Sequence, residues 1–350
     1  MQTKKSFLLF LTLVMMTAFA LVGCNSQVSN GEAEEKETET APATDSEYPI
    51  TITHALGEAV IESKPERIAT IQWANHDVAL ALGIVPVGFS AANFGVQDDS
   101  GLLPWTKEKL AELGVENPNV FQDTDGLDFE AISDSNPDVL LAAYSGITPE
   151  DYETLSQIAP VIAYPTSAWT TTWREQITFN AAGMGMKEEG EQLIKDTEAL
   201  IADKLSAYPQ IEGKKVVWVN FSANDLSQLH IYTPIDSRVA FLKELGMTYP
   251  EGVTELITDP TSYSLNLSAE NVKVLFDADL IVGYGDAALY ETIKADPLIG
   301  KIPAVERGSV AFITSDTPLV AAGTPNPLSI AYTIDEYLEL LGEAIDNMEE

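Results

Sequence analysis

The chain has 350 residues, of which 45% are hydrophobic, and its 54 acidic residues against 19 Lys and Arg give a formal net charge of −35. This charge argues against nucleic-acid binding, which depends on Lys and Arg neutralising phosphates. It also argues against attachment to an anionic lipid surface by charge. A chain of this length is expected to bury a large core and to divide into two lobes.

The first segment, residues 1–23, has the features of an export signal. Lys4 and Lys5 give a short basic start, and residues 7–22 are apolar except for two threonines. This run is shorter than the roughly 20 apolar residues of a membrane span. It ends at Gly23-Cys24, and Cys24 is the single cysteine of the chain. The segment resembles a bacterial lipoprotein signal with its lipobox, which implies lipid attachment at Cys24. The alternative is an ordinary signal peptide or anchor with an incidental cysteine.

The next segment, residues 24–47, is predicted to be a disordered acidic tether. It contains seven acidic residues against Lys36 and has no aromatic residue. Such a composition cannot bury enough apolar surface to fold. If the chain is cleaved before Cys24, the loss of two lysines moves the formal charge from −35 to −37.

Apolar runs and helical patterns alternate from Tyr48 onward, which favours an α/β fold with mainly parallel sheets. In the N-terminal lobe, residues 48–172, we expect strands at 50–54, 67–71, 85–89, 139–143 and 161–164, and helices at 76–82 and 150–158. In the C-terminal lobe, residues 209–350, we expect strands at 215–221, 229–232, 280–283 and 310–313, and helices at 237–245, 270–275 and 328–346. The lobes are expected to be Rossmann-like.

Residues 173–208 lie between the two lobes and show no strand pattern. Residues 173–182 are helical in character, Gly183 and Gly185 interrupt them, and residues 187–207 carry an apolar stripe at helical spacing. At 1.5 Å per residue this second helix would span about 31 Å, roughly the width of a small domain. The segment is therefore predicted to be a stiff helical connection between the lobes.

A short internal sequence repeat suggests that the lobes are related. Asp128 and Ser268 each precede a short helix that contains a Glu, and Asp138 and Asp279 each introduce an apolar strand. The matching positions in the two halves favour pseudo-symmetry.

The sequence contains few motifs that are typical of catalysis or of a metal or cofactor site. The three histidines are far apart without metal-ligand spacing, and the sequence has no nucleophile elbow, phosphate-binding loop or dinucleotide fingerprint. The acidic residues are so abundant that a hydrolase built on two carboxylates stays open as an alternative. We otherwise expect a binding protein without enzymatic activity and without an intrinsic cofactor or metal site.

Aromatic and amide residues recur just after the predicted strands, where ligands bind in open α/β sheets. The candidate ligand-binding residues are Trp73, Asn93, Phe94, Tyr144, Trp169, Trp173, Asn220, Arg238, Tyr263, Tyr284 and Thr317. Each ring alone is more simply explained by packing. Their recurrence in both halves predicts a cleft lined by rings and amides.

Several segments together resemble the iron-siderophore and cobalamin class of periplasmic-type binding proteins. The segments that carry the resemblance are 67–69, 81–88, 137–140, 155–161, 237–238, 245–246, 277–280, 302–305 and 308–310. The resemblance extends over about residues 48–345. It implies two α/β lobes joined by one long helix, and delivery of a bound ferric chelate to an ABC permease with its ATPase.

The resemblance also implies roles for individual residues. Glu130 and Glu270 match positions that dock to permease arginines, although each could merely favour a helix N-terminus. Arg238 matches a position that often meets an anionic chelate, and Tyr144 matches a ligand contact. Ferric iron prefers oxygen donors, and a siderophore supplies them itself, so protein ligands are not needed. Because the loop 93–97 has no basic residue, a hydroxamate or mixed chelate is favoured over a triscatecholate.

We therefore expect a monomeric, lipid-anchored receptor on the extracytoplasmic face of the cell membrane that captures a ferric siderophore. Cobalamin and haem remain the alternative ligands, and an exported hydrolase is the alternative of a different class.

Overall fold

The computed structural model describes residues 48–95, 98–123, 125–315 and 317–348. The predicted signal segment, the lipidation site at Cys24 and the acidic tether to residue 47 lie outside the described residues. No helix within the described ranges is long and apolar enough to cross a membrane.

The N-terminal lobe is built on a five-stranded sheet in which every neighbouring pair is parallel, in the order β5-β4-β3-β6-β7. A separate antiparallel hairpin, β1-β2, precedes it. The elements are β1 (Ile50–His54), β2 (Gly57–Ile61), β3 (Ile68–Thr70), α1 (Asn75–Ala81), β4 (Gly88–Ser90), α2 (Pro104–Glu112), β5 (Val120–Phe121), α3 (Phe129–Asp134), β6 (Val139–Leu141), α4 (Pro149–Leu155) and β7 (Val161–Ile162).

The C-terminal lobe has a five-stranded sheet in the order β10-β9-β8-β11-β12. Strands β8, β11 and β12 are parallel, whereas β9 and β10 are antiparallel additions. The elements are η1 (Pro209–Ile211), β8 (Val216–Ser222), β9 (Asp225–Tyr232), α7 (Ser237–Glu244), α8 (Glu251–Thr254), β10 (Ser264–Ser268), η2 (Ala269–Leu275), β11 (Leu280–Tyr284), α9 (Ala287–Ala295), η3 (Ile299–Lys301), α10 (Pro303–Arg307), β12 (Val310–Ile313), η4 (Pro318–Gly323) and α11 (Pro327–Asp346).

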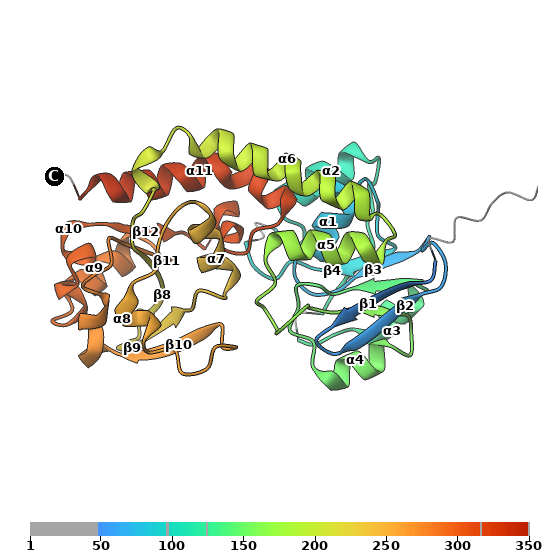
Figure 1. The fold of residues 1–350 in the computed structure, drawn as a ribbon, viewed down its shortest axis with the longest axis horizontal. Coiled ribbons are helices and arrows are strands. Elements are labelled where there is room, and N and C mark those ends of the chain that lie inside the picture. Colours follow the sequence, from blue (N-terminus) through green and yellow to red (C-terminus); the bar gives the residue numbers. More distant parts are fainter. Residues whose placement is uncertain (1–47, 96–97, 124, 316, 349–350) are drawn as a thin grey trace, which may run out of the picture. The chain divides into compact units, whose positions relative to one another are not determined.

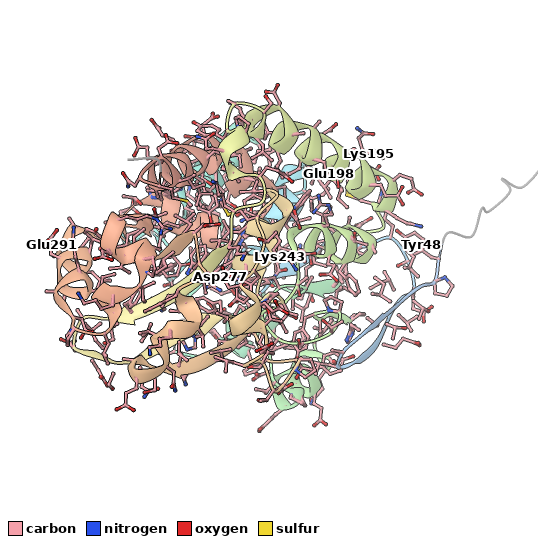
Figure 2. All side chains as sticks on the ribbon, turned by 60° about the vertical axis from the view of Figure 1, so that its left-hand side comes forward. Tyr48, Lys195, Glu198, Lys243, Asp277 and Glu291 are labelled. Atoms are coloured by element: carbon pink, nitrogen blue, oxygen red, sulfur yellow. The ribbon has the colours of Figure 1, made fainter. Side chains whose placement is uncertain are left out.

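Two helices separate the N-terminal sheet from the C-terminal sheet along the chain. Helix α5 (Trp173–Gly183) begins at a capping box formed by Thr172 and Glu175, and α6 (Lys187–Leu205) follows after a short break. The outer face of α6 carries exposed charged residues such as Lys195 (Figure 2). The two helices pack against each other, and α6 also packs against the terminal helix α11.

Helix α11 is a second connection between the lobes, because it contacts α1 and α2 of the N-terminal lobe as well as η1 and β12 of the C-terminal lobe. It runs alongside α6 (Figure 1). Its apolar stripe includes Ile330, Ile334 and Leu338, which are almost fully buried. The sequence predicts this helix but assigns it to one lobe only.

The internal repeat has a structural counterpart at the starts of equivalent strands in the two lobes. Asp138 precedes β6, and its Oδ2 accepts the N–H groups of Glu66 and Arg67 at 2.9 Å, just before β3. Asp279 precedes β11, and its Oδ2 accepts the N–H group of Lys215 at 2.8 Å, just before β8. In both lobes, therefore, one aspartate ties together the starts of two central parallel strands.

The helix before each aspartate differs between the lobes. Helix α3 is capped by Asp128, whose side chain accepts the Ala131 N–H group at 3.0 Å. The corresponding element η2 is a 3-10 helix, and the Ser268 side chain makes no capping hydrogen bond. The predicted helix at 270–275 therefore forms with tighter winding than an α-helix.

Candidate functional site

A cavity of about 660 Å³ lies beyond the carboxyl ends of the central strands and is lined by residues of both lobes. This is where ligands bind in open α/β sheets. Its volume falls within the roughly 300–1,000 Å³ of small-molecule sites. The lining residues are Gln72, Trp73, Ser90, Ala91, Asn93, Phe94, Asp123, Tyr144, Trp169, Asn220, Tyr232, Asp236, Arg238, Tyr263, Tyr284, Ser315 and Thr324.

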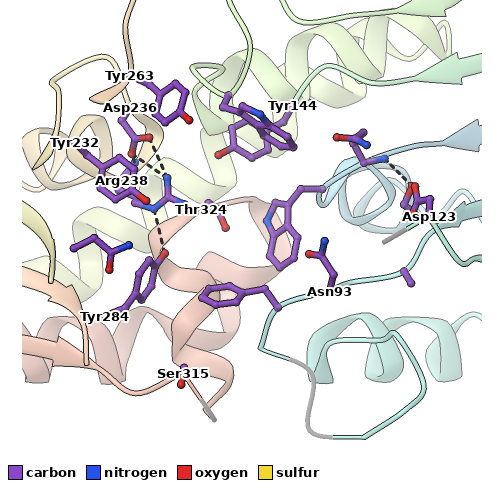
Figure 3. A pocket seen from close by; sticks show the side chains of 17 residues that line it. Asn93, Asp123, Tyr144, Tyr232, Asp236, Arg238, Tyr263, Tyr284, Ser315 and Thr324 are labelled. Carbon is purple, nitrogen blue, oxygen red and sulfur yellow. Dashed lines mark hydrogen bonds and ion pairs between the residues drawn. The ribbon is translucent and has the colours of Figure 1, made fainter. Parts of the chain in front are cut away.

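The C-terminal side of the cavity is organised around Arg238, at the start of α7 (Figure 3). Asp236 caps this helix by accepting the Arg238 N–H group at 2.9 Å, and its Oδ2 pairs with the Arg238 guanidinium at 3.0 Å. The guanidinium also donates from Nε to the Tyr284 hydroxyl at 3.1 Å and lies 4.4 Å above the Tyr232 ring. These contacts hold the arginine in one orientation.

Arg238 stays protonated in the cavity. Burial by itself would lower its pKa, but Tyr284 and Asp236 outweigh burial and hold the pKa above the usual value. Burial raises the pKa of Tyr284, although Arg238 opposes this effect. The site therefore presents a permanent cation beside a neutral phenol at neutral pH.

Four of the described residues that line the N-terminal side of the cavity are aromatic. The Trp73 and Phe94 rings meet with centroids 6.4 Å apart, and the Tyr144 and Trp169 rings meet edge to face at 5.4 Å. Phe94 also reaches across to Tyr284 of the other lobe, with ring centroids 5.4 Å apart. Aromatic faces and edges of this kind suit the apolar surface of a bulky ligand.

A second contact between the lobes lies at the edge of the cavity. The Tyr144 hydroxyl and the Ser237 hydroxyl are 3.1 Å apart, and both side chains are buried. Burial raises the pKa of Tyr144, which keeps the phenol neutral and able to donate a hydrogen bond. This hydrogen bond links the strand end after β6 to the first residue of α7.

Unusual backbone conformations occur beside the lining rings. Gln72 and Trp169 line the cavity with φ angles of 62° and 63°, in the left-handed region that non-glycine residues rarely occupy. Gly146 is required next to Trp169, because a Cβ atom there would collide with the indole. Gly323 is required in the same way beside the Tyr284 hydroxyl. Backbone strain of this kind costs on the order of 1–3 kcal/mol per residue and tends to occur at functional sites.

Nine of the eleven predicted ligand-binding residues line this one cavity: Trp73, Asn93, Phe94, Tyr144, Trp169, Asn220, Arg238, Tyr263 and Tyr284. Two do not. Trp173 is 1% exposed in the hydrophobic core, and its indole N–H donates to Glu244 at 2.8 Å. The Thr317 hydroxyl donates to the backbone carbonyl of Thr314 at 2.9 Å, and Thr317 directly precedes η4 outside the lining.

Sequence reasoning missed eight lining residues: Gln72, Ser90, Ala91, Asp123, Tyr232, Asp236, Ser315 and Thr324. Gln72 and Ser90 each directly follow a predicted strand, 67–71 and 85–89, so their position alone could have identified them. Asp123 and Asp236 could not be distinguished among 54 acidic residues.

The remaining predicted residues lie away from the cavity or outside the described part of the chain. Glu130 and Glu270 are exposed, in the first turns of α3 and η2. Cys24 lies outside the described residues. Within the described ranges, no three His, Cys, Asp or Glu side chains are grouped so that they could hold a metal ion.

Comparisons with known proteins give one consistent result. The profile of the periplasmic binding protein family matches residues 68–317. The probable siderophore-binding lipoprotein YfiY of Bacillus subtilis is 25% identical over 301 residues, which cover 83% of this chain and 81% of YfiY. The ferric enterobactin-binding periplasmic protein FepB of Escherichia coli is 25% identical over 289 residues, which cover 77% of this chain and 86% of FepB.

Among solved structures, PiaA of Streptococcus pneumoniae TIGR4 in complex with ferrichrome is 52% identical and superposes with a TM-score of 0.82. The match covers 85% of this chain and 99% of PiaA. The family profile matches more than half of the chain, and the two-lobed fold and the cavity between the lobes agree with it. The chain therefore belongs to the periplasmic binding protein family.

Proposed function

We propose that this protein is an extracytoplasmic receptor that binds a ferric siderophore and delivers it to an ABC permease for iron uptake. The observation that carries the proposal is the cavity of about 660 Å³ between the lobes, lined by rings and one arginine. It occurs in a chain that is 52% identical to PiaA, whose structure contains ferrichrome. The protein acts as a transport receptor and not as an enzyme.

The cavity suits a chelate that brings its own iron ligands. Ferric iron prefers hard oxygen donors, and in a siderophore complex the chelator supplies them. The protein then has to recognise only the outer surface of the complex. Arg238 can donate hydrogen bonds to chelate oxygens, and Trp73, Phe94 and Trp169 can pack on its apolar parts.

A hydroxamate is the preferred type of chelate. Ferrichrome is a hydroxamate siderophore, and Arg238 is the single cation among the described residues that line the cavity. A triscatecholate carries a larger negative charge and would need more cations to compensate it. Mixed chelates, cobalamin and haem are the remaining candidates.

Tryptophan fluorescence titration tests this proposal, because Trp73 and Trp169 line the cavity. The purified protein is titrated with ferrichrome, ferric enterobactin, cobalamin and haem. We expect saturable quenching by ferrichrome with a Kd below about 1 μM. If none of these ligands binds more tightly than about 10 μM, the receptor function is refuted.

We also propose that Glu130 and Glu270 dock the loaded receptor onto its permease. One lies on each lobe, and both are exposed, so a partner that faces both lobes could reach them. We expect the Glu130→Ala/Glu270→Ala variant to bind the chelate normally and to lose iron uptake in cells. A matched control is Glu150→Ala/Glu251→Ala, which removes exposed first-turn glutamates from α4 and α8. Equal loss of uptake in both variants would contradict docking.

The proposed membrane attachment rests on the sequence before residue 48. A lipid on Cys24 and the acidic tether would keep a monomeric receptor near its permease. We expect Cys24→Ala to release the protein from the membrane fraction and to abolish labelling by a palmitate analogue. Retention of the variant in the membrane fraction would contradict lipid anchoring.

A further inference from the structure

The charges that face the cavity are unevenly shared between its two sides. Among the described residues of the lining, Arg238 is the only cation, whereas Asp123 and Asp236 are both anions, which leaves a formal charge of −1. Asp236 is fully buried and paired with Arg238 at 3.0 Å. The arginine is therefore already compensated within its own lobe, and the carboxylate without a cationic partner in the lining is Asp123.

Asp123 is held in place by a chain of hydrogen bonds across three adjacent strand ends. The backbone N–H of Gln72, after β3, donates to the Ser90 hydroxyl at 2.7 Å, and the Ser90 hydroxyl donates to Asp123 Oδ2. Ser90 ends β4, and Asp123 follows β5, so the three residues lie along neighbouring strands of the sheet. Figure 3 shows Asp123 on the side of the cavity opposite to Arg238.

This arrangement gives the carboxylate a fixed position and free capacity to bind. An ionised carboxylate can accept about four hydrogen bonds, and Ser90 provides one. Burial raises the pKa of Asp123, and the hydrogen bond from Ser90 opposes that effect by favouring the ionised form. Asp123 is half-buried, so its charge is less screened by water than a surface charge would be.

The charge of siderophore complexes varies with their chemistry. Three singly charged hydroxamates neutralise a ferric ion, whereas three doubly charged catecholates leave a net charge of three minus. A pendant amine adds a positive charge to a hydroxamate complex, and a pendant carboxylate adds a negative one. A lining with a compensated arginine and one further carboxylate disfavours the anionic complexes and can accept hydrogen bonds from amide or ammonium N–H groups.

We propose that Asp123 is a specificity-determining residue that makes this receptor select ferric hydroxamates with zero or positive net charge over anionic chelates. The proposal rests on the proposed function, since it concerns which siderophores the same cavity accepts. Its distinctive consequence is that affinity depends on the charge of a pendant group when the iron-binding groups stay the same.

The test compares three forms of one chelate. Ferrioxamine B carries a pendant ammonium, N-acetyl ferrioxamine B is neutral, and N-succinyl ferrioxamine B carries a pendant carboxylate, while all three share the same hydroxamates. Kd is measured for each by fluorescence quenching at low ionic strength, with ferrichrome as the neutral reference. We expect the cationic form to bind at least about tenfold more tightly than the anionic form.

Asp123→Asn keeps an oxygen that can accept the Ser90 hydrogen bond and removes the charge. We expect it to reduce the difference between the cationic and anionic forms to less than about threefold. The matched control is Asp125→Asn, which removes the same charge two residues away at an exposed position outside the lining. Thermal unfolding of both variants checks that the fold is retained.

The outcomes separate the two proposals. If no chelate binds, the proposed receptor function fails. If the chelates bind but Asp123→Asn leaves their order unchanged, Asp123 does not determine specificity. If Asp125→Asn reduces the charge dependence as much as Asp123→Asn does, the effect comes from the overall acidity of the protein, and the proposal is overturned.

Discussion

The two sides of the cavity are built in different ways. On the C-terminal side, Arg238 is fixed by a fully buried Asp236, by the Tyr284 hydroxyl and by the Tyr232 ring. On the N-terminal side, Trp73, Phe94 and Trp169 meet other rings through edge contacts. A buried charge needs a complete set of partners, whereas rings need only complementary surfaces. The C-terminal side therefore supplies a cation fixed by its partners, and the N-terminal side supplies aromatic surfaces together with the carboxylate of Asp123.

Removing the cationic pair should have the largest effect on binding. Replacing Arg238 alone would leave Asp236 buried and unpaired, so the informative variant is Asp236→Asn/Arg238→Met, which removes both charges. We expect about a hundredfold loss of ferrichrome affinity by calorimetry, because hydrogen bonds to charged groups contribute about 1.5–3 kcal/mol each. Lys243→Met, on the exposed face of α7, is the control and should bind normally. A Kd of the double variant within threefold of the original Kd would contradict a main role of the Arg238–Asp236 pair in binding.

Removing a ring from the N-terminal side should have a smaller effect. We expect Trp169→Ala to weaken ferrichrome binding about tenfold, in line with the 1–2 kcal/mol typical of a contacting aromatic side chain. Trp173→Phe is the comparison, because Trp173 lies in the core and bonds to Glu244. That variant should lose about 1 kcal/mol of unfolding free energy and keep its affinity. A greater loss of affinity in Trp173→Phe than in Trp169→Ala would reverse the assignment.

The hydrogen bond between Tyr144 and Ser237 should contribute less to ferrichrome affinity than the cationic pair or a ring does. Tyr144→Phe and Ser237→Ala each remove one partner of the bond at 3.1 Å. We expect each to weaken ferrichrome binding about three- to fivefold, since a neutral hydrogen bond contributes about 0.5–1.5 kcal/mol. The double variant should be no weaker than the single ones. Additive losses would mean that the two hydroxyls act independently.

A fourth prediction concerns stability and not binding. Burial lowers the pKa of His54, and its Nδ1 accepts the N–H group of Leu56 at 3.3 Å, which requires the neutral ring. Because the folded pKa lies below the ordinary value, the unfolded chain takes up a proton first as the pH falls. The contribution of neutral His54 to the free energy of unfolding is therefore lost as the pH falls below about 6.5. In urea unfolding at several pH values, the free energy of unfolding should decline less steeply with falling pH for His54→Gln than for the original protein. An unchanged dependence on pH would contradict this role of His54.

Much of the fold follows from sequence because its central strands are continuous apolar runs. The predicted strands 50–54 and 310–313 match β1 and β12 exactly in their bounds. Strands β2, β5 and β10 were missed, because β2 begins with Gly57 and Glu58, β5 has only two residues, and β10 has only two apolar residues, Leu265 and Leu267. Helix α2 was missed because its apolar positions do not form a clear stripe.

The site was predictable where it depends on position after a strand. Asn93 and Tyr144 lie just after predicted strands, Asn220 lies near the end of one, and all three line the cavity. Position alone fails for Trp173, because a ring at the start of a helix can point into the core as readily as into a cavity. It also cannot identify Asp236, whose importance comes from its buried pairing with Arg238. Such a pairing exists only in the folded chain.

The most direct test of the account is a crystal structure of the protein with ferrichrome, in which anomalous scattering locates the iron. We expect one iron peak inside the cavity between the lobes, with Arg238 within hydrogen-bonding distance of a chelate oxygen and the rings of Trp73 and Trp169 against the chelator. An iron peak outside this cavity, or iron coordinated directly by protein carboxylates, would contradict it.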